Sequence, residues 1–151
     1  MNCRWRQCFG TCFPKRSIQL TLLLVGINNA GKTTLFNSLQ GDSLSITVPT
    51  YGFNTTEVIT SACSFKLYDL GGGRSIRRIW GIYAPEVHGV IYVVDSADPA
   101  SFPEARNALQ QLLAAPQLSG KPLLLFANKQ DLPEAQPLEA VTAALSLQEL
   151  Q

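Results

Sequence analysis

Eight residues, Gly26 to Thr33, place two glycines, a lysine and a hydroxyl in the order G-x-x-x-x-G-K-T. A loop of this kind turns successive backbone N–H groups inward, and a helix that begins at its end adds partial positive charge. The lysine then reaches the β- and γ-phosphates of a nucleotide, and the next hydroxyl is a ligand for Mg²⁺. We therefore predict a phosphate-binding loop, with contacts from Gly26, Ile27, Asn28, Asn29, Ala30, Gly31, Lys32, Thr33 and Thr34.

Two further oxygen donors complete a predicted Mg²⁺ site. Asp69 ends an apolar segment, where its carboxylate can hold Mg²⁺ through water, and the backbone N–H of Gly72 can approach a γ-phosphate closely. Thr50 could offer its hydroxyl to the metal when a γ-phosphate is present. The predicted metal ligands are Thr33, Thr50 and Asp69.

The phosphate loop alone leaves ATP and GTP both open, and residues 128–131 narrow the choice. Asp131 can accept hydrogen bonds from N1–H and the 2-amino group of guanine, whereas adenine offers neither donor. A buried Asp131 would then be left unpaired beside adenine, a loss that typically discriminates between the bases by several kcal/mol. Asn128 would bond the base edge and support the phosphate loop, and the stem of Lys129 would cover one face of the base.

Alternating strands and helices must position these residues. Strands are predicted near 18–25, 53–60, 63–69, 88–95 and 122–127, and helices near 31–40, 75–83, 101–115 and 137–145. The apolar runs 90–94 and 123–126 are typical of strands buried on both faces of a parallel sheet. Ser101 and Glu104 have the spacing of a capping box. The predicted fold class is α/β, a P-loop NTPase fold whose mostly parallel sheet is flanked by helices.

Composition and charge limit the other functions of the chain. A length of 151 residues favours one domain, with 46% hydrophobic residues for its core, and no apolar stretch is long enough to span a membrane. Four of the 12 basic residues precede position 17, so the remaining eight face 11 acidic residues in a mildly acidic body. This balance argues against nucleic-acid binding.

The first 17 residues form a predicted basic tail, and the domain occupies 18–151. Aromatic and cysteine side chains recur on one face of a helix there, beside Arg4 and Arg6, which suits a membrane interface. Thioacylation would strengthen the anchor, and the predicted lipidation sites are Cys3, Cys8 and Cys12. The alternative is a frayed terminus whose aromatic residues pack on the domain.

The motifs together resemble those of the Ras superfamily of small GTPases, in its Arf/Arf-like branch. Residues 49–54 resemble the P-T-x-G-F-N switch I of the branch, residues 69–72 its D-x-G-G switch II, 93–96 its V-V-D-S strand end, and 128–131 its N-K-Q-D element. The resemblance covers about residues 18–151 and implies a GTP/GDP switch with Mg²⁺. Effectors, GTPase-activating proteins and exchange factors would bind switch I and switch II, the latter spanning 72–83.

Within the branch, the chain looks most like the ciliary Arf-like thirteen subfamily. The similarity lies in residues 69–73, in residues 76–80 and in the cysteine-bearing tail. Members of that subfamily are thioacylated at N-terminal cysteines and act as exchange factors for a second Arf-like GTPase. The resemblance therefore implies a cytoplasmic protein held peripherally on a ciliary or other internal membrane.

The chain departs from the family pattern at two places. Gly73 stands where most Arf-like proteins have the glutamine that orients the attacking water, so no catalytic side chain is assigned beside Gly72 and Gly73, and GTP hydrolysis should be weak. The sequence also stops before the last strand and helix of the usual G domain, which predicts exposed core residues, such as those of strand 18–25, and reduced nucleotide affinity. A fragment or isoform, and a catalytically inert binding module or exchange factor, remain open alternatives.

Overall fold

The computed structural model describes residues 19–41, 47–59 and 64–149. Five strands form one sheet in the order β2-β3-β1-β4-β5. Every neighbouring pair is parallel except β2 and β3, where Phe53 lies opposite Leu70 in an antiparallel hairpin. The strands are β1 (Gln19–Val25), β2 (Phe53–Ile59), β3 (Ser64–Leu70), β4 (Gly89–Asp95) and β5 (Leu123–Asn128).

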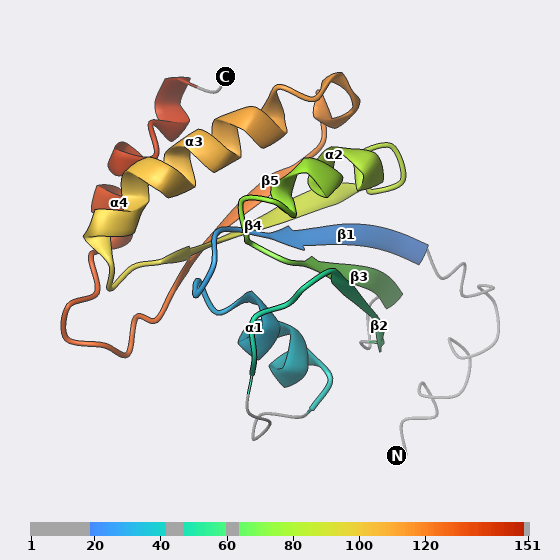
Figure 1. The fold of residues 1–151 in the computed structure, drawn as a ribbon, viewed down its shortest axis with the longest axis horizontal. Coiled ribbons are helices and arrows are strands. Elements are labelled where there is room, and N and C mark those ends of the chain that lie inside the picture. Colours follow the sequence, from blue (N-terminus) through green and yellow to red (C-terminus); the bar gives the residue numbers. More distant parts are fainter. Residues whose placement is uncertain (1–18, 42–46, 60–63, 150–151) are drawn as a thin grey trace, which may run out of the picture.

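Helices cover both faces of this sheet (Figure 1). One face carries α1, and the other carries α2, α3 and α4. Short 3-10 turns join the elements at residues 77–79, 99–101, 116–118 and 147–149. The helices are α1 (Lys32–Leu39), α2 (Trp80–Tyr83), α3 (Phe102–Leu113) and α4 (Leu138–Ala144). The predicted α/β class and mostly parallel sheet are confirmed.

The central strand β1 separates two apolar clusters. Leu23 and Val25 point into the larger cluster beneath α2, α3 and α4, while Leu24 points into the smaller one beneath α1, which also contains Phe36. Alternate residues of a strand face opposite sides of the sheet, so a strand buried on both faces must be apolar throughout. The apolar run Leu22–Val25 at the end of β1 has this cause.

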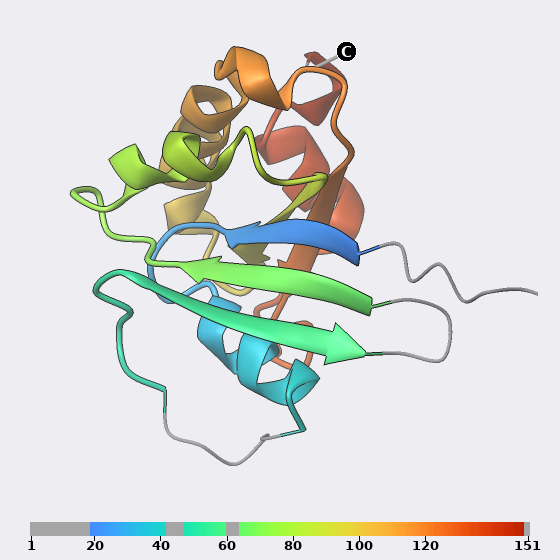
Figure 2. The ribbon, with the colours of Figure 1, turned by 90° about the vertical axis from the view of Figure 1, so that its right-hand side faces the viewer.

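The parallel arrangement brings the functional segments to one edge of the sheet. The segment Gly26–Gly31 follows β1, Gly71–Gly73 follow β3, and Asn128 ends β5. The carboxyl ends of parallel strands share an edge, and ligands of open α/β sheets bind in the crevice outside it. In Figure 2 the strands β2, β3 and β1 lie side by side, with the loops of this edge running past their ends.

The prediction that strand 18–25 would be exposed is wrong for its inner residues. Leu23, Leu24 and Val25 have no exposed surface, because β1 is paired on both sides and covered on both faces. The exposed large apolar residues of the sheet lie on its two outer strands: Phe53 and Ile59 on β2 are 50% and 78% exposed, and Leu124 on β5 is 56% exposed. Among the strands that the structure describes, β5 pairs only with β4 and forms an edge.

Candidate functional site

The loop after β1 has the backbone of a phosphate cradle. Asn29 and Gly31 adopt left-handed conformations, with φ of 61° and 90°. Alternation of left- and right-handed residues turns successive N–H groups toward one point, as an anion requires. A β-carbon at Gly31 would overlap the side chain of Asn128, and one at Gly26 would overlap the Val93 carbonyl. Both glycines are therefore required by close packing as well as by the turn.

Lys32 opens α1 and is buried inside this loop. Its exposed fraction is 6%, and Nζ donates to the Ile27 carbonyl at 2.8 Å. Burial lowers the pKa of Lys32 to about 8, although Asp69 opposes the shift. The lysine is thus held at the floor of the loop with little water around it, where an anionic ligand would stabilise its charged form.

The three predicted metal ligands meet at one point beside the loop. Thr33 Oγ1 donates to Asp69 Oδ2 at 2.9 Å and lies 3.0 Å from Thr50 Oγ1. Asp69 has no exposed surface, and its Oδ1 has no hydrogen-bond partner within the described parts of the chain. Burial raises the pKa of Asp69, against hydrogen bonds and charge from Thr33 and Lys32.

This donor set fits Mg²⁺. Hydroxyl and carboxylate oxygens are its preferred ligands, and it is usually held by one or two carboxylates together with water and phosphate oxygens. The unpartnered Oδ1 of Asp69 is a buried acceptor that a cation or its water would satisfy. The residues come from α1, the segment before β2 and the end of β3, so only the folded chain brings them together.

A cavity of about 410 Å³ opens over these groups. Its volume lies within the range of small-molecule sites, and the residues around it are mostly polar. It is lined by Asn28, Asn29, Gly31, Lys32, Thr33, Thr34, Thr47, Val48, Pro49, Thr50, Gly72 and Lys129. Predicted phosphate and metal contacts thus share one concave surface with Lys129, one of the predicted base-recognition residues.

The predicted base-recognition residues lie at the end of β5. Asn128 Nδ2 donates to the Ala30 carbonyl at 2.9 Å, which ties β5 to the phosphate loop as the sequence predicts. Lys129 has a left-handed φ of 61°, and its Nζ lies 2.6 Å from Asp95 Oδ2 at the end of β4. The stem of Lys129 is therefore fixed along the cavity wall. Asp131 is exposed to solvent and does not line the cavity.

The glycines after β3 have unequal roles. A β-carbon at Gly72 would lie 2.5 Å from the Gly26 carbonyl oxygen, so only glycine fits there. At Gly73 the nearest atom would be Asn28 Nδ2 at 3.8 Å, an ordinary contact distance. The backbone at Gly73 has no conformation that excludes a side chain, so glycine at this position has no steric cause.

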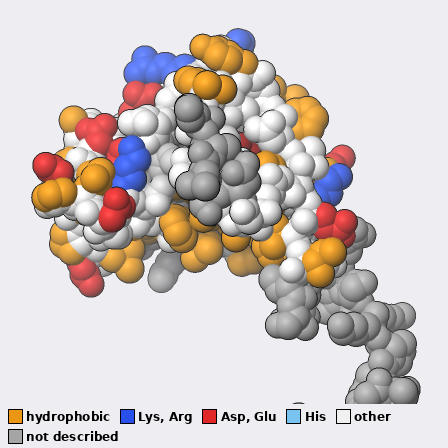
Figure 3. Space-filling view, turned by 90° about the horizontal axis from the view of Figure 1, so that it is seen from below, with side chains coloured by type: hydrophobic (Ala, Val, Ile, Leu, Met, Phe, Trp, Pro, Cys, Tyr) orange, Lys and Arg blue, Asp and Glu red, His pale blue; other side chains and the backbone are white. Residues whose placement is uncertain are grey.

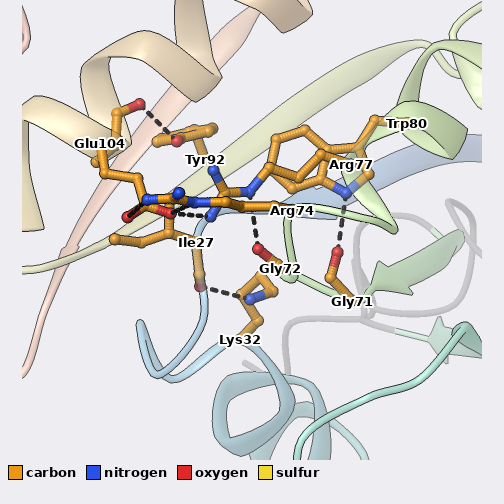
Figure 4. Close-up of polar contacts among 10 residues, drawn as sticks. Ile27, Lys32, Gly71, Gly72, Arg74, Arg77, Trp80, Tyr92 and Glu104 are labelled. Carbon is orange, nitrogen blue, oxygen red and sulfur yellow. Dashed lines mark hydrogen bonds and ion pairs between the residues drawn. The ribbon is translucent and has the colours of Figure 1, made fainter.

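Several residues around switch II were not assigned from the sequence. Glu104 forms no capping box, since Ser101 makes no side-chain cap and instead donates to the Asp98 carbonyl at 2.7 Å. The Glu104 carboxylate pairs with Arg74 and Arg77 across the gap between α3 and switch II (Figure 4). The capping prediction is wrong because two nearby arginines compete for the same carboxylate. No spacing in the sequence identifies this pairing.

The predicted tail, with Cys3, Cys8 and Cys12, lies outside the described residues. Among the helices that the structure does describe, none has the length and hydropathy to cross a bilayer.

Comparison with known proteins decides the family. The sequence profile of the ADP-ribosylation factor family matches residues 8–151. The chain belongs to the ADP-ribosylation factor (Arf) family. It is an Arf-like small GTPase, a nucleotide-binding switch whose motifs are the ones assembled around the cavity.

Individual relatives from this family are similar over most of the chain. ADP-ribosylation factor-like protein 13B of Chlamydomonas reinhardtii is 44% identical over 136 residues, which are 90% of this chain but 26% of that protein. The chain thus spans about a quarter of that relative. ADP-ribosylation factor 3 of Arabidopsis thaliana is 39% identical over 150 residues, covering 99% of this chain and 81% of the plant protein.

A solved structure supports the same P-loop GTPase fold. The Arl6 BBS3 small GTPase of Trypanosoma brucei, determined with the bound nucleotide analogue GppNp, aligns with a TM-score of 0.79 and 27% identity. The alignment covers 87% of this chain and 80% of that structure. The α/β fold predicted from the sequence is therefore that of the Arf-like GTPases.

Proposed function

We propose that this Arf-family domain binds GTP and GDP together with Mg²⁺ and hydrolyses GTP slowly. The observation that carries the proposal is the meeting of Thr33, Thr50 and Asp69 around an unpartnered buried carboxylate oxygen, at the edge of a cavity that Lys32 lines. When bound, Mg²⁺ would neutralise charge on the β- and γ-phosphate oxygens. Thr33 and Asp69 would hold it in both nucleotide states, and Thr50 only beside a γ-phosphate.

Base recognition is assigned to residues 128–131. Asn128 supports the phosphate loop, the stem of Lys129 covers one face of guanine, and Asp131 accepts from its N1–H and 2-amino group. Asp131 is exposed, so its carboxylate is accessible to a base. Guanine should therefore be preferred over adenine by a large factor, since adenine would leave the carboxylate without a donor.

Weak hydrolysis follows from the residue type at position 73. The glutamine that orients water in most Arf-like proteins is replaced by Gly73, which has no polar group except its backbone. No other described side chain of switch II enters the cavity lining. We therefore propose that the chain remains in its GTP-bound, signalling state for a long time.

Nucleotide binding is tested by chromatography of the nucleotide released from the purified chain and by titration with a fluorescent GTP analogue. Lys32→Ala and Asp131→Ala should each lose binding, whereas Glu134→Ala, an exposed carboxylate in the same loop, should bind as the parent does. Excess ATP should not displace the analogue from the parent. A parent chain that binds no nucleotide would overturn the proposal and support an inert binding module or exchange factor instead.

Partners are proposed to bind switch I and switch II through an aromatic surface. Phe53 and Tyr83 have ring centroids 5.6 Å apart, and Tyr68 and Tyr83 are 5.2 Å apart. Tyr51 and Phe53 are 91% and 50% exposed, so part of this surface is open to a partner. Aromatic residues are enriched at protein interfaces. The proposed partners are effectors, GTPase-activating proteins, exchange factors and a second Arf-like GTPase.

Membrane attachment is proposed for the tail, by thioacylation of Cys3, Cys8 and Cys12. A cytoplasmic protein held peripherally on a ciliary or other internal membrane would result. Hydroxylamine-sensitive incorporation of a palmitate probe should be lost when the three cysteines are replaced by serine. Equal incorporation into the serine variant would contradict this assignment.

A further inference from the structure

The backbone of Gly71–Gly73 is held by side chains that lie on one side of it. Trp80 Nε1 donates to the Gly71 carbonyl at 3.0 Å, and Arg77 Nε donates to the Gly72 carbonyl at 2.8 Å. In the view of Figure 4, Trp80 and Arg77 lie on one side of the two glycines, and Lys32 of the phosphate loop lies on the other. Two successive peptide carbonyls are therefore fixed from the side of α2.

The amide hydrogens of these peptide units must point the opposite way. A trans peptide unit is planar, and its C=O and N–H groups point in opposite directions. The N–H groups of Gly72 and Gly73 therefore point away from Trp80 and Arg77. Gly72 lines the cavity and packs on the backbone of the phosphate loop, and neither N–H group donates to another residue in the parts of the chain that the structure describes.

The two side chains are themselves fixed by the core and by α3. Trp80 is 2% exposed and packs edge-on against Tyr92, with ring centroids 6.4 Å apart. The side chain of Arg77 is 14% exposed, and its Nη2 lies 2.5 Å from Glu104 Oε1. Glu104 also pairs with Arg74, whose side chain is 82% exposed and, within the described residues, makes no hydrogen bond to the glycine carbonyls.

Three consecutive glycines need such support. Glycine loses more conformational freedom on ordering than any other residue, so this tripeptide is costly to hold in one conformation. Hydrogen bonds to its carbonyls restrict it before a ligand arrives, and binding then costs less ordering entropy. In this chain the requirement is greater than in a D-x-G-G-Q sequence, because Gly73 adds a third flexible residue.

We propose that Trp80 and Arg77, the latter braced by Glu104, are positioning residues that aim the Gly72 and Gly73 amides at the terminal phosphate of GTP. This inference rests on the proposed nucleotide binding and deepens it. GDP lacks the phosphate that these amides would meet. The two residues should therefore set the preference for GTP over GDP and leave the affinity for GDP almost unchanged.

The test compares two arginines that share one carboxylate partner. Arg77→Met and Trp80→Phe each remove one donor to a glycine carbonyl and retain an apolar side chain, while Arg74→Met removes an ion pair to Glu104 without touching the turn. Affinities for GDP and for a non-hydrolysable GTP analogue are measured for each variant by fluorescence titration. Arg77→Met and Trp80→Phe should weaken the GTP analogue about tenfold and GDP less than about twofold. Arg74→Met should change both by less than about twofold.

The affinity for GDP serves as the internal measure of an intact site. Equal weakening of GDP and the GTP analogue would assign Trp80 and Arg77 a structural role only and overturn the inference. Unchanged affinity for both nucleotides would overturn it as well, as would an Arg74→Met variant that behaves like Arg77→Met. A parent chain that binds neither nucleotide would overturn the proposed function itself, and this inference with it.

Discussion

At the scale of single residues, the neighbouring glycines Gly72 and Gly73 differ in whether a side chain would fit. Gly72 is required because any β-carbon would meet the backbone of the phosphate loop at 2.5 Å. Gly73 has room, with its nearest potential neighbour at 3.8 Å. Packing therefore does not require glycine at position 73, and a side chain can be introduced there without disturbing the fold.

Replacement of Gly73 by glutamine should raise GTP hydrolysis. The new amide could orient a water at the cavity, and we expect the single-turnover rate to rise at least about tenfold. Gly73→Ala is the matched control, since it adds the same β-carbon without an amide. If both variants hydrolyse GTP at the same rate as the parent, position 73 does not limit hydrolysis.

The stability of the fold should depend on pH through Glu104. Hydrogen bonds from Arg74 and then Arg77 lower the pKa of Glu104 to about 2, from an ordinary value of 4.5. A carboxyl whose pKa is lower in the folded state stabilises the fold fully above about pH 4.5, and this contribution is lost as the pH falls toward 2. Solvent screening keeps it small, because the Glu104 side chain is 37% exposed.

Denaturant unfolding of the parent and of Glu104→Gln between pH 7 and pH 3 measures this contribution. The difference in unfolding free energy should be constant above about pH 5 and should shrink at lower pH. A difference that grows on acidification would contradict the assigned pairing with the arginines.

At the scale of elements, the site depends on contacts between segments far apart in the sequence. Asn128 at the end of β5 donates to the carbonyl of Ala30, 98 positions earlier. Asp95 at the end of β4 holds Lys129 with a contact of 2.6 Å and also accepts the Ala97 N–H at 3.0 Å. The ends of β4 and β5 thus support both the base side of the cavity and the phosphate loop.

Removal of the Asn128 amide should loosen the phosphate loop. We expect Asn128→Ala to lower the unfolding free energy by about 1 kcal/mol, because the phosphate loop loses the hydrogen bond to Ala30. GDP release should become about tenfold faster or more, because the base also loses its contact with the Asn128 side chain. Stopped-flow release of a fluorescent GDP and thermal unfolding measure the two effects. Gln130→Ala, two positions later and exposed, is the control; an equal effect in both variants would contradict the tether.

At the scale of the whole molecule, the sheet is unevenly covered. Leu124 on the outer strand β5 is 56% exposed. Phe126 on the same strand, Ile91 on β4 and Leu22 on β1 are only half-buried. Figure 3 looks onto the molecule from below and shows hydrophobic side chains at its surface in several places. Exposed apolar surface next to an unpaired strand edge favours self-association.

A charged residue on β5 should therefore reduce self-association of the chain. Leu124→Lys should raise the concentration at which light scattering first reports association, while nucleotide affinity stays within about twofold, because Leu124 does not line the cavity. Val141→Lys is the contrasting variant, since Val141 is fully buried and a charge there should unfold the domain. If Leu124→Lys associates at the same concentration as the parent, self-association does not involve Leu124.

The sequence by itself determined the motifs and the alternation of strands and helices, because G-x-x-x-x-G-K-T and N-K-Q-D are local patterns and buried parallel strands are apolar throughout. The same motifs predict Thr33, Thr50, Asp69 and Asn128 as residues of the site. The tertiary structure alone decided that Glu104 pairs with arginines instead of capping α3, and that Trp80 and Arg77 hold the glycine turn. The Glu104 contacts join α3 to switch II across 27 and 30 positions, and the bonds to the glycine turn span 5 and 9 positions outside any regular repeat, so no local pattern encodes them.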